Sequence, residues 1–273
     1  IMTALIALRD GNLDDTVTFS HEAVFSIPYG YSHIALDVGE KLTLEQALYA
    51  ALLPSANEAC YGIAEHISGS LEAFIEEMNK TARELGATNT HFVNSNGIHD
   101  DDHYTTAHDM ALIMKEAIQY EKFQEIISTR NYHIPPTNIK EERYILNTNE
   151  TIKKDSKYYN EHVVGAKTGY TEPAGKTLVT YAKRGNVDLI VVVMKATSNH
   201  VFEDTNALIE YYLDENATIA TYGVSETDHI LIPSEVEQEG YSNSVVATVK
   251  PAGSLSYYKS GILTDSYIKK VEA

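Results

Sequence analysis

The sequence predicts an α/β protein of the α+β type, in which an antiparallel sheet is covered by helices and accompanied by a mainly helical subdomain. Three observations support this fold class. Residues 42–67, 70–86 and 105–118 carry helical periodicity, residues 176–196 have the pattern of a β-hairpin, and residues 202–216 return to helical periodicity. Strands that follow one another closely in a chain pair antiparallel, and helices cover the sheet that they form.

The first half of the chain predicts helices. Residues 1–9 have the apolar spacing of a helix, and residues 42–67 predict two helices separated at Pro54. Thr43 and Gln46 have the spacing of a capping box, which marks the start of the first helix of this pair.

Two further amphipathic helices follow. Residues 70–86 place apolar side chains at intervals of three and four and end at Gly86, a residue typical of helix C-termini. Residues 105–118 repeat the pattern behind a Thr106–Asp109 capping pair. These helices complete the predicted helical subdomain.

From about residue 130 the periodicity changes to that of strands. Segments 131–138 and 143–149 are short and β-like. Residues 176–196 form two β-branched runs around a turn, and the second run, Leu189 to Val193, is apolar throughout. Such a run predicts a central strand covered on both faces. Residues 202–216 predict a closing helix.

The chain divides into two predicted units. Residues 1–216 form the main domain, and residues 217–273, with short β-like runs separated by Gly and Pro, form a small β-rich C-terminal module. A length of 273 residues is sufficient for one large and one small unit. The chain begins in mid-pattern, so we expect the first helix to start upstream of Ile1.

The composition argues against several classes of function. The chain has 21 Lys and Arg against 39 Asp and Glu, and its net charge is −18. It lacks the cation clusters on which binding to a phosphate backbone depends, so no nucleic acid partner is expected.

Cys60 is the single cysteine, which excludes a disulfide within the chain. No apolar stretch reaches the ~18 residues of a membrane-spanning helix, so we expect membrane contact only through an anchor outside this chain.

The segment PSANEA, residues 54–59, has two interpretations. Ser55 and Glu58 fit a capping box behind the helix-ending Pro54. Alternatively, Ser55 and Asn57 project into a cleft from the turn between two helices, because alternate positions of a turn can place a hydroxyl and an amide close together. The segment alone leaves both interpretations open.

The segment Lys167-Thr168-Gly169 also has two interpretations. A lysine before a turn is commonly a solvated charge. Functionally, an ammonium group beside a hydroxyl at a sheet edge can hold a carboxylate, and Gly169 would let the backbone of a ligand approach the strand.

The segment HDDDH, residues 99–103, raises the alternative of a metal hydrolase built on His99 and His103. An extended loop would direct these side chains to opposite faces, and the polar neighbours favour a solvated loop. No metal site and no cofactor are therefore expected.

The order of these motifs resembles that of penicillin-interacting serine enzymes, in which a Ser-x-Asn triplet precedes a Lys-Thr-Gly. The chain is similar to D-alanyl-D-alanine carboxypeptidases of the low-molecular-mass penicillin-binding protein type. The similarity covers about residues 1–215, where five segments stand in family order: IMTALIAL, LLPSANEA, NSNGIHDDDHYTTAHDMALIM, GAKTGYTEPAGKTLVTYAKR and LIVVVM. It implies a β-lactamase/transpeptidase-like fold, and in relatives the His-Asp loop is structural.

Two departures from the family pattern stand out. In relatives a Ser-x-x-Lys directly precedes the segment that matches IMTALIAL, so the nucleophile is expected upstream of Ile1. The chain as given is therefore expected to be inactive and not to react with penicillin. Thr148 stands where some relatives carry an arginine that helps to hold the substrate carboxylate.

The resemblance implies a function and a role for each matched residue. The intact enzyme would remove the terminal D-Ala from peptidoglycan stem peptides ending in D-Ala-D-Ala, through an acyl-enzyme that β-lactams also form. Ser55 would relay a proton to the leaving amine, and Asn57 would hold the peptide. Lys167 and Thr168 would hold the carboxylate, and a backbone N–H after Gly169 would contribute to the oxyanion hole.

The same resemblance implies an exported protein of the bacterial cell envelope. One alternative from another functional class is a binding protein: a degenerate, non-catalytic penicillin-binding fold that holds peptidoglycan or peptide. The missing Ser-x-x-Lys favours this alternative, whereas the intact Ser55, Asn57 and Lys167 argue against it.

Overall fold

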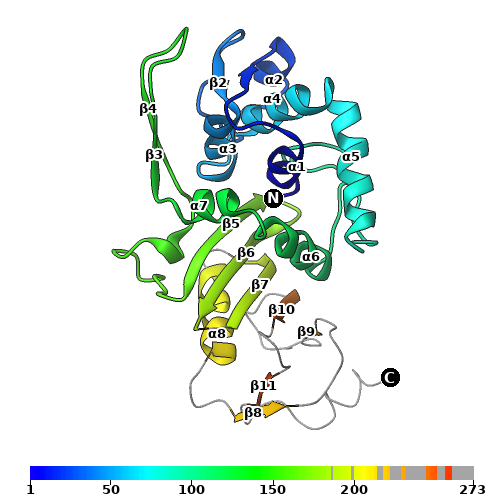
Figure 1. Ribbon diagram of the computed structural model, residues 1–273, viewed down its shortest axis with the longest axis vertical. Coiled ribbons are helices and arrows are strands. Elements are labelled where there is room, and N and C mark those ends of the chain that lie inside the picture. Colours follow the sequence, from blue (N-terminus) through cyan, green and yellow to red (C-terminus); the bar gives the residue numbers. More distant parts are fainter. Residues whose placement is uncertain are drawn as a thin grey trace.

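The computed structural model describes residues 1–185, 187–197 and 200–213 with their side chains, and four later strands as backbone. A helical subdomain lies at one end of the described chain, and a sheet lies beside it (Figure 1). The elements of the helical subdomain are α1 (Met2–Asp10), β1 (Thr16–Thr18), α2 (His21–Phe25), β2 (Lys41–Thr43), α3 (Leu44–Leu52), α4 (Asn57–Ser68), α5 (Leu71–Glu84), α6 (Ala107–Ala117) and α7 (Glu121–Ser128).

The remaining elements build the sheet, its cover and a projecting hairpin. They are β3 (Asn131–Ile134), β4 (Arg143–Leu146), the short 3-10 helix η1 (Glu150–Ile152), β5 (Val163–Thr171), β6 (Gly175–Arg184), β7 (Val187–Ala196), α8 (His200–Leu213), β8 (Thr218–Thr221), β9 (His229–Leu231), β10 (Ser244–Lys250) and β11 (Ser256–Lys259).

Helix α1 is the central helix of the helical subdomain. It contacts α3, α4, α5, α6 and α7, and Leu5 and Ile6 at its middle are fully buried. Because the surrounding helices cover it from several sides, α1 is apolar around most of its circumference, as the sequence predicts.

The predicted helix starts are confirmed at α3 and α6. The Thr43 hydroxyl accepts a hydrogen bond from the Gln46 backbone N–H, and the Gln46 side chain accepts one from the Thr43 N–H. The Thr106 hydroxyl accepts from the Asp109 N–H at 3.1 Å. Each bond satisfies a backbone donor that a helix N-terminus leaves without a partner.

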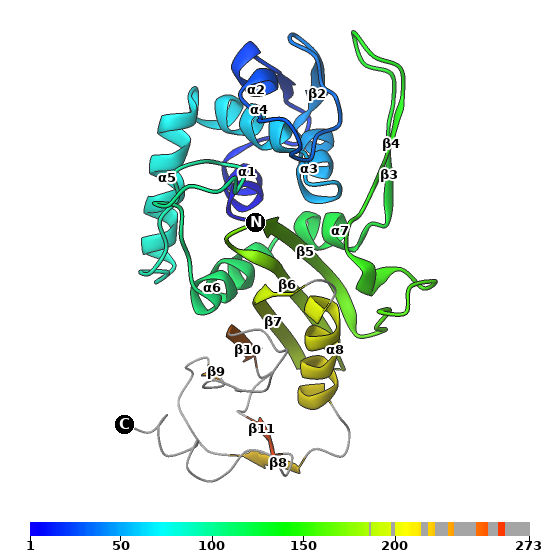
Figure 2. The ribbon, with the colours of Figure 1, turned by 180° about the vertical axis from the view of Figure 1, so that it is seen from behind.

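The main sheet is antiparallel, with the strand order β5-β6-β7-β10-β9. Helix α6 packs on one face and α8 on the other, so β7 is covered on both sides (Figures 1 and 2). Leu189, Val191 and Val193 pack in the cluster that contains α8, whereas Ile190 and Val192 pack toward the helical subdomain. The prediction of a central apolar strand is confirmed.

Strand β5 forms one edge of this sheet and lies against α7. A Cβ atom at Gly165 would lie 2.6 Å from the Ile127 side chain and 2.7 Å from the Ile127 backbone. Only glycine therefore allows α7 to pack this closely against the strand that carries Lys167.

The β3–β4 hairpin extends along the outer side of the helical subdomain, beside α3 and opposite α5 (Figures 1 and 2). Tyr132 of β3 stacks on Tyr49 of α3, with ring centroids 3.7 Å apart. This stacking fixes the base of the hairpin to the helical subdomain.

The boundary between residues 216 and 217 stays a prediction, because most of residues 217–273 lie outside the described residues. The described strands β9 and β10 continue the main sheet beyond β7, and β8 pairs with β11. Within the described part of the chain, no helix is both long and apolar enough to cross a bilayer.

Replacing Gly62 by alanine is expected to destabilise the fold by up to about 2 kcal/mol. A Cβ atom at Gly62 would lie 2.4 Å from the ring of Phe19, which is fully buried. Overpacking costs ~1–3 kcal/mol, which outweighs the helix-propensity gain of ~1 kcal/mol. Urea unfolding measures the change. The double variant Phe19→Leu/Gly62→Ala should lose less free energy of unfolding than the two single variants lose together. If the two losses simply add, the proposed clash between residue 62 and the ring of Phe19 is contradicted.

Candidate functional site

Ser55 lies in the turn between α3 and α4, with its backbone in the left-handed region at φ +64°. Its hydroxyl accepts a hydrogen bond from Lys167 Nζ at 2.8 Å. The N-cap residue of α4 is Ala56, which makes no side-chain capping bond. The capping-box interpretation of Ser55 is therefore wrong. Strained backbone of this kind persists where the surrounding contacts fix it, and it is common at functional sites.

Asn57 begins α4 and is buried, with 8% of its surface exposed. Its Nδ2 donates to the Ser32 carbonyl at 2.9 Å and to the Ser55 carbonyl at 3.4 Å, and its backbone N–H donates to the Ser32 carbonyl at 3.0 Å. The amide of Asn57 therefore joins the turn that carries Ser55 to the loop that carries Ser32.

Glu58 anchors the same loop and was not recognised as doing so from the sequence. Its Oε1 accepts a hydrogen bond from the Ile34 N–H at 2.7 Å. Burial raises the pKa of the Glu58 carboxyl group. A glutamate three residues after a serine suggested a capping box, and only the structure shows that this side chain binds a distant loop.

Lys167 is half-buried, and its Nζ donates to Ser55 Oγ and to the Thr168 carbonyl, both at 2.8 Å. Burial of the ammonium group lowers the pKa of Lys167 from 10.5 to about 8, an effect that the nearby Cys60 partly opposes. The interpretation of Lys167 as a solvated strand-end charge is therefore wrong. The contact joins two segments that are 112 residues apart in the sequence.

Thr168 lies beside Thr148, the residue that replaces the arginine of some relatives. Their hydroxyl oxygens are 2.6 Å apart, and Thr148 Oγ1 also donates to the Leu53 carbonyl at 3.3 Å. A Cβ atom at Gly169 would lie 2.4 Å from Thr177 Oγ1. Close packing against β6 therefore requires a glycine here, in addition to any space for a ligand.

The N-terminal end of α1 lies next to this group, at the end of β5 (Figures 1 and 2). Burial lowers the pKa of the Ile1 α-amino group to about 6; the nearby Cys60 partly opposes this shift, and the charge of Lys167 contributes to it. Cys60, one helical turn after Asn57, is also enclosed here, and burial raises its pKa to about 11. No sequence pattern predicts that Cys60 lies near the motif residues.

The His-Asp loop lies apart from these contacts. His103 packs edge-on against Phe92 and accepts a hydrogen bond from the Val93 N–H at 3.3 Å, and burial lowers its pKa. His99 lies 3.4 Å from Asp101. Among the described residues, no group of three or more His, Cys, Asp and Glu side chains is arranged to hold a metal ion. The metal-hydrolase alternative finds no support there.

The assembled site consists of an enclosed cation, three hydroxyl groups and a buried amide. Ser55, Lys167, Thr168 and Thr148 form a continuous series of contacts from the α3–α4 turn through β5 to the base of the hairpin. An enclosed ammonium group of this kind attracts an anionic group, because the low dielectric constant around it strengthens the attraction.

Comparisons with known proteins identify the family of this chain. The model of the D-alanyl-D-alanine carboxypeptidase family, peptidase S11, matches residues 1–198. The D-alanyl-D-alanine carboxypeptidase DacF of Bacillus subtilis is 36% identical over 220 residues, which cover 78% of this chain and 53% of DacF. The D-alanyl-D-alanine carboxypeptidase of Streptomyces sp. strain K15 is 32% identical over 72% of this chain and 71% of that protein.

Solved structures show the same similarity. The Streptomyces K15 DD-transpeptidase has a TM-score of 0.69 at 29% identity, covering 76% of this chain and 82% of its own. A penicillin-binding protein homolog of Mycobacterium tuberculosis, Rv2911, has a TM-score of 0.67 at 26% identity, covering 80% and 81%. The predicted β-lactamase/transpeptidase-like fold class is confirmed, and the chain belongs to the D-alanyl-D-alanine carboxypeptidase family, peptidase S11.

Proposed function

We propose that this protein is a serine-type D-Ala-D-Ala carboxypeptidase of the cell wall, sensitive to penicillin and exported to the cell envelope. Its substrate is the peptidoglycan stem peptide that ends in D-Ala-D-Ala. The observation that carries the proposal is the hydrogen bond between Lys167 and Ser55, which joins the two family motifs. The chain spans 53% of the length of DacF, so the activity of the whole protein is part of this proposal.

The substrate carboxylate binds at Lys167 and Thr168. Hydrogen bonds to a charged group are stronger than neutral ones, contributing ~1.5–3 kcal/mol each. The arriving carboxylate raises the pKa of Lys167, because an opposite charge favours the ammonium form. Binding of the anion and protonation of Lys167 are therefore coupled.

The reaction breaks the bond between the two D-Ala residues in two steps. A serine hydroxyl upstream of Ile1 attacks the penultimate carbonyl carbon, and a neighbouring lysine takes its proton. The Ser55 hydroxyl passes a proton to the leaving amine and regains the proton that the upstream lysine took from the nucleophile, while Lys167 stays protonated and orients the Ser55 hydroxyl. Backbone N–H groups stabilise the oxyanion, and water then hydrolyses the ester.

The position of α1 supports the placement of the nucleophile upstream of Ile1. The Ile1 α-amino group is enclosed and senses the charges of Lys167 and Cys60, so residues that precede Ile1 would enter the same site. A Ser-x-x-Lys there would place both side chains within one helical turn. The 273-residue chain, which lacks this segment, is accordingly proposed to be inactive.

Labelled penicillin tests the proposal. A chain extended upstream through Ser-x-x-Lys should form a covalent adduct that survives denaturation, and it should release D-Ala from a stem pentapeptide. The 273-residue chain should do neither. A covalent adduct on the 273-residue chain, or an extended chain that folds but stays unlabelled, would contradict the mechanism. Reversible peptide binding without turnover by the extended chain would support the non-catalytic binding protein instead.

A further inference from the structure

The loop between α2 and β2 forms a bridge between the α3–α4 turn and the β3–β4 hairpin. We call residues 31–40 the clasp loop. At its near end, the Ser32 carbonyl accepts two hydrogen bonds from Asn57, one from the side chain and one from the backbone N–H, and the Ile34 N–H donates to Glu58. Two consecutive residues at the start of α4 thus hold this end of the loop.

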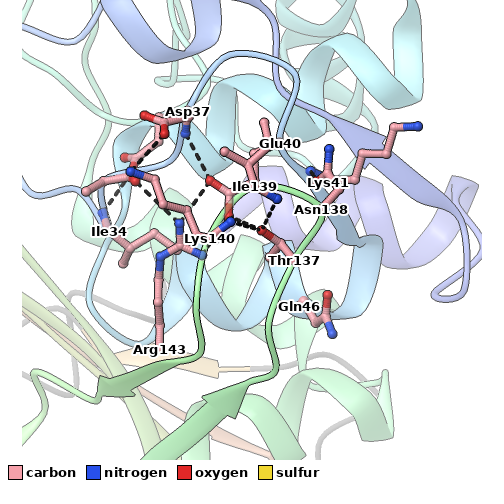
Figure 3. Close-up of polar contacts among 12 residues, drawn as sticks. Ile34, Asp37, Glu40, Lys41, Gln46, Thr137, Asn138, Ile139, Lys140 and Arg143 are labelled. Carbon is pink, nitrogen blue, oxygen red and sulfur yellow. Dashed lines mark hydrogen bonds and ion pairs between the residues drawn. The ribbon is translucent and has the colours of Figure 1, made fainter.

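At its far end, the clasp loop is held by Glu40, which is completely buried. Glu40 Oε1 forms an ion pair with Arg143 at 2.7 Å and accepts from the Thr137 hydroxyl at 2.9 Å. Oε2 accepts from Arg143 at 2.9 Å and from the Asp37 N–H at 3.0 Å. Figure 3 shows these side chains converging on the carboxylate from the loop and from the hairpin.

Arg143 also reaches the middle of the clasp loop. It donates to the Ala35 carbonyl at 3.4 Å, and Ala35 has a φ of +57°, a left-handed conformation that is rare for residues with a side chain. Such a conformation persists only where neighbouring contacts fix it. One guanidinium group therefore contacts the loop at both Ala35 and Glu40.

The hairpin that supplies Arg143 returns to the same site at its base. Just after β4, Thr148 donates to the Leu53 carbonyl, two residues before Ser55, and contacts Thr168. The contacts thus form a closed ring, which runs from Asn57 through the clasp loop to Arg143, along β4 to Thr148, and back to the α3–α4 turn.

We propose that Glu40 and Arg143 are positioning residues that fix the orientation of the Asn57 side chain through the clasp loop. The expected effect on ligand binding rests on the proposed function, whereas the effect on Asn57 does not. A buried ion pair is weak evidence for a stabilising role, because an apolar pair of similar size is often equally stable. The geometric role and the stabilising role can therefore be separated by experiment.

The first measurement is amide hydrogen exchange with NMR spectroscopy on the 15N-labelled 273-residue chain. In Arg143→Met, the N–H groups of Ile34 and Asn57 should exchange at least tenfold faster, and the Asn57 side-chain amide signals should shift. The N–H of Phe92, which donates to Asn79 elsewhere in the helical subdomain, should keep its exchange rate. Lys140→Met is the matched control, because it removes an exposed ion pair with Asp37 of the same loop.

The double variant Glu40→Leu/Arg143→Met distinguishes positioning from stability. It removes both charges, so it should regain most of the melting temperature that the single variant loses, while exchange at Ile34 and Asn57 stays fast. If the double variant restores slow exchange together with the melting temperature, the pair is only structural and the proposal is overturned. Unchanged exchange in Arg143→Met would overturn it as well. If Arg143→Met does not fold, hydrogen exchange at Ile34 and Asn57 is compared in Arg143→Lys and in the double variant, and the same outcomes support or overturn the proposal.

The second measurement is the dissociation constant of a peptide that ends in D-Ala-D-Ala, obtained by titration of the same chains. The double variant should bind it about tenfold more weakly, and Lys140→Met should bind it as the parent does. A parent chain that binds no peptide would count against the proposed function alone, because the exchange experiment still decides the role of the pair. Equal affinity in the parent and the double variant, together with unchanged Asn57 signals, would overturn the inference.

Discussion

Lys167→Ala is expected to slow acylation by penicillin ten- to more than a hundredfold in a chain that includes the upstream nucleophile. The ammonium group donates to Ser55 and is the enclosed cation of the site. Loss of a charge-assisted hydrogen bond of ~1.5–3 kcal/mol corresponds to roughly this range of rates. Loss of the hydrogen bond that orients the Ser55 hydroxyl adds to the effect. Acylation rates and a thermal melt of each variant provide the measurement.

Two variants serve as controls for this result. Lys183→Ala removes an exposed lysine of β6 that pairs with Asp188, and it should acylate at the parent rate. Lys167→Arg should recover only part of the rate, because the guanidinium group is larger and planar. If Lys167→Ala is acylated at the parent rate, or if unfolding of the variant fully explains its slower acylation, then Lys167 is only a structural residue.

The second large effect is a rise in the stability of the 273-residue chain with pH. The pKa of Lys167 is about 8 in the folded chain and 10.5 in the reference state. Below pH 8 both states carry the proton, and the folded state bears the cost of a buried charge. Between pH 8 and 10.5 the unfolded state binds more protons, so the free energy of unfolding rises. At about 1.4 kcal/mol per pKa unit, the gain approaches about 3 kcal/mol.

The measurement compares Lys167→Met with its parent by denaturant unfolding across pH 7–11. Cys60 has the opposite effect, because its pKa is raised to about 11 and the unfolded thiol loses its proton first. Both chains should therefore carry Cys60→Ala. The stability of the parent relative to Lys167→Met should rise from pH 8 to 10.5. A flat difference would show that the ammonium group is effectively solvated.

The sequence predicts the elements whose determinants are local. The Thr43–Gln46 capping box and the apolar run of β7 lie within a few residues of the structure that they specify, and both predictions are confirmed. Helices α2 and α7 were missed, since five and eight residues are too short for a clear periodicity. In α7, three buried side chains carry the pattern, and the rest of the helix is polar or exposed.

The environment of the site residues could not be predicted in the same way. Ser55 and Lys167 were selected by motif order, but the environment of Lys167 depends on its contact with the α3–α4 turn, 112 residues away in the sequence. The same applies to Glu58, which has the local spacing of a cap and binds Ile34 instead. Burial and long-range partners follow from tertiary packing, on which local periodicity carries no information.

Under the proposed function, the enclosed ammonium group of Lys167 has a consequence for how fast an anionic peptide finds the site. The chain carries a net charge of −18, so its long-range field repels a peptide that ends in a carboxylate. The attraction of one enclosed cation acts only at short range, within the low-dielectric surroundings of the site. Dissolved ions shorten the Debye length to ~8 Å at physiological ionic strength, which screens the distant acidic residues much more than the buried contact. The association rate of the peptide therefore increases as ionic strength rises, whereas the strength of its contact with Lys167 changes little. The association rate depends on the acidic residues of the whole chain, and the strength of the bound contact depends on the site.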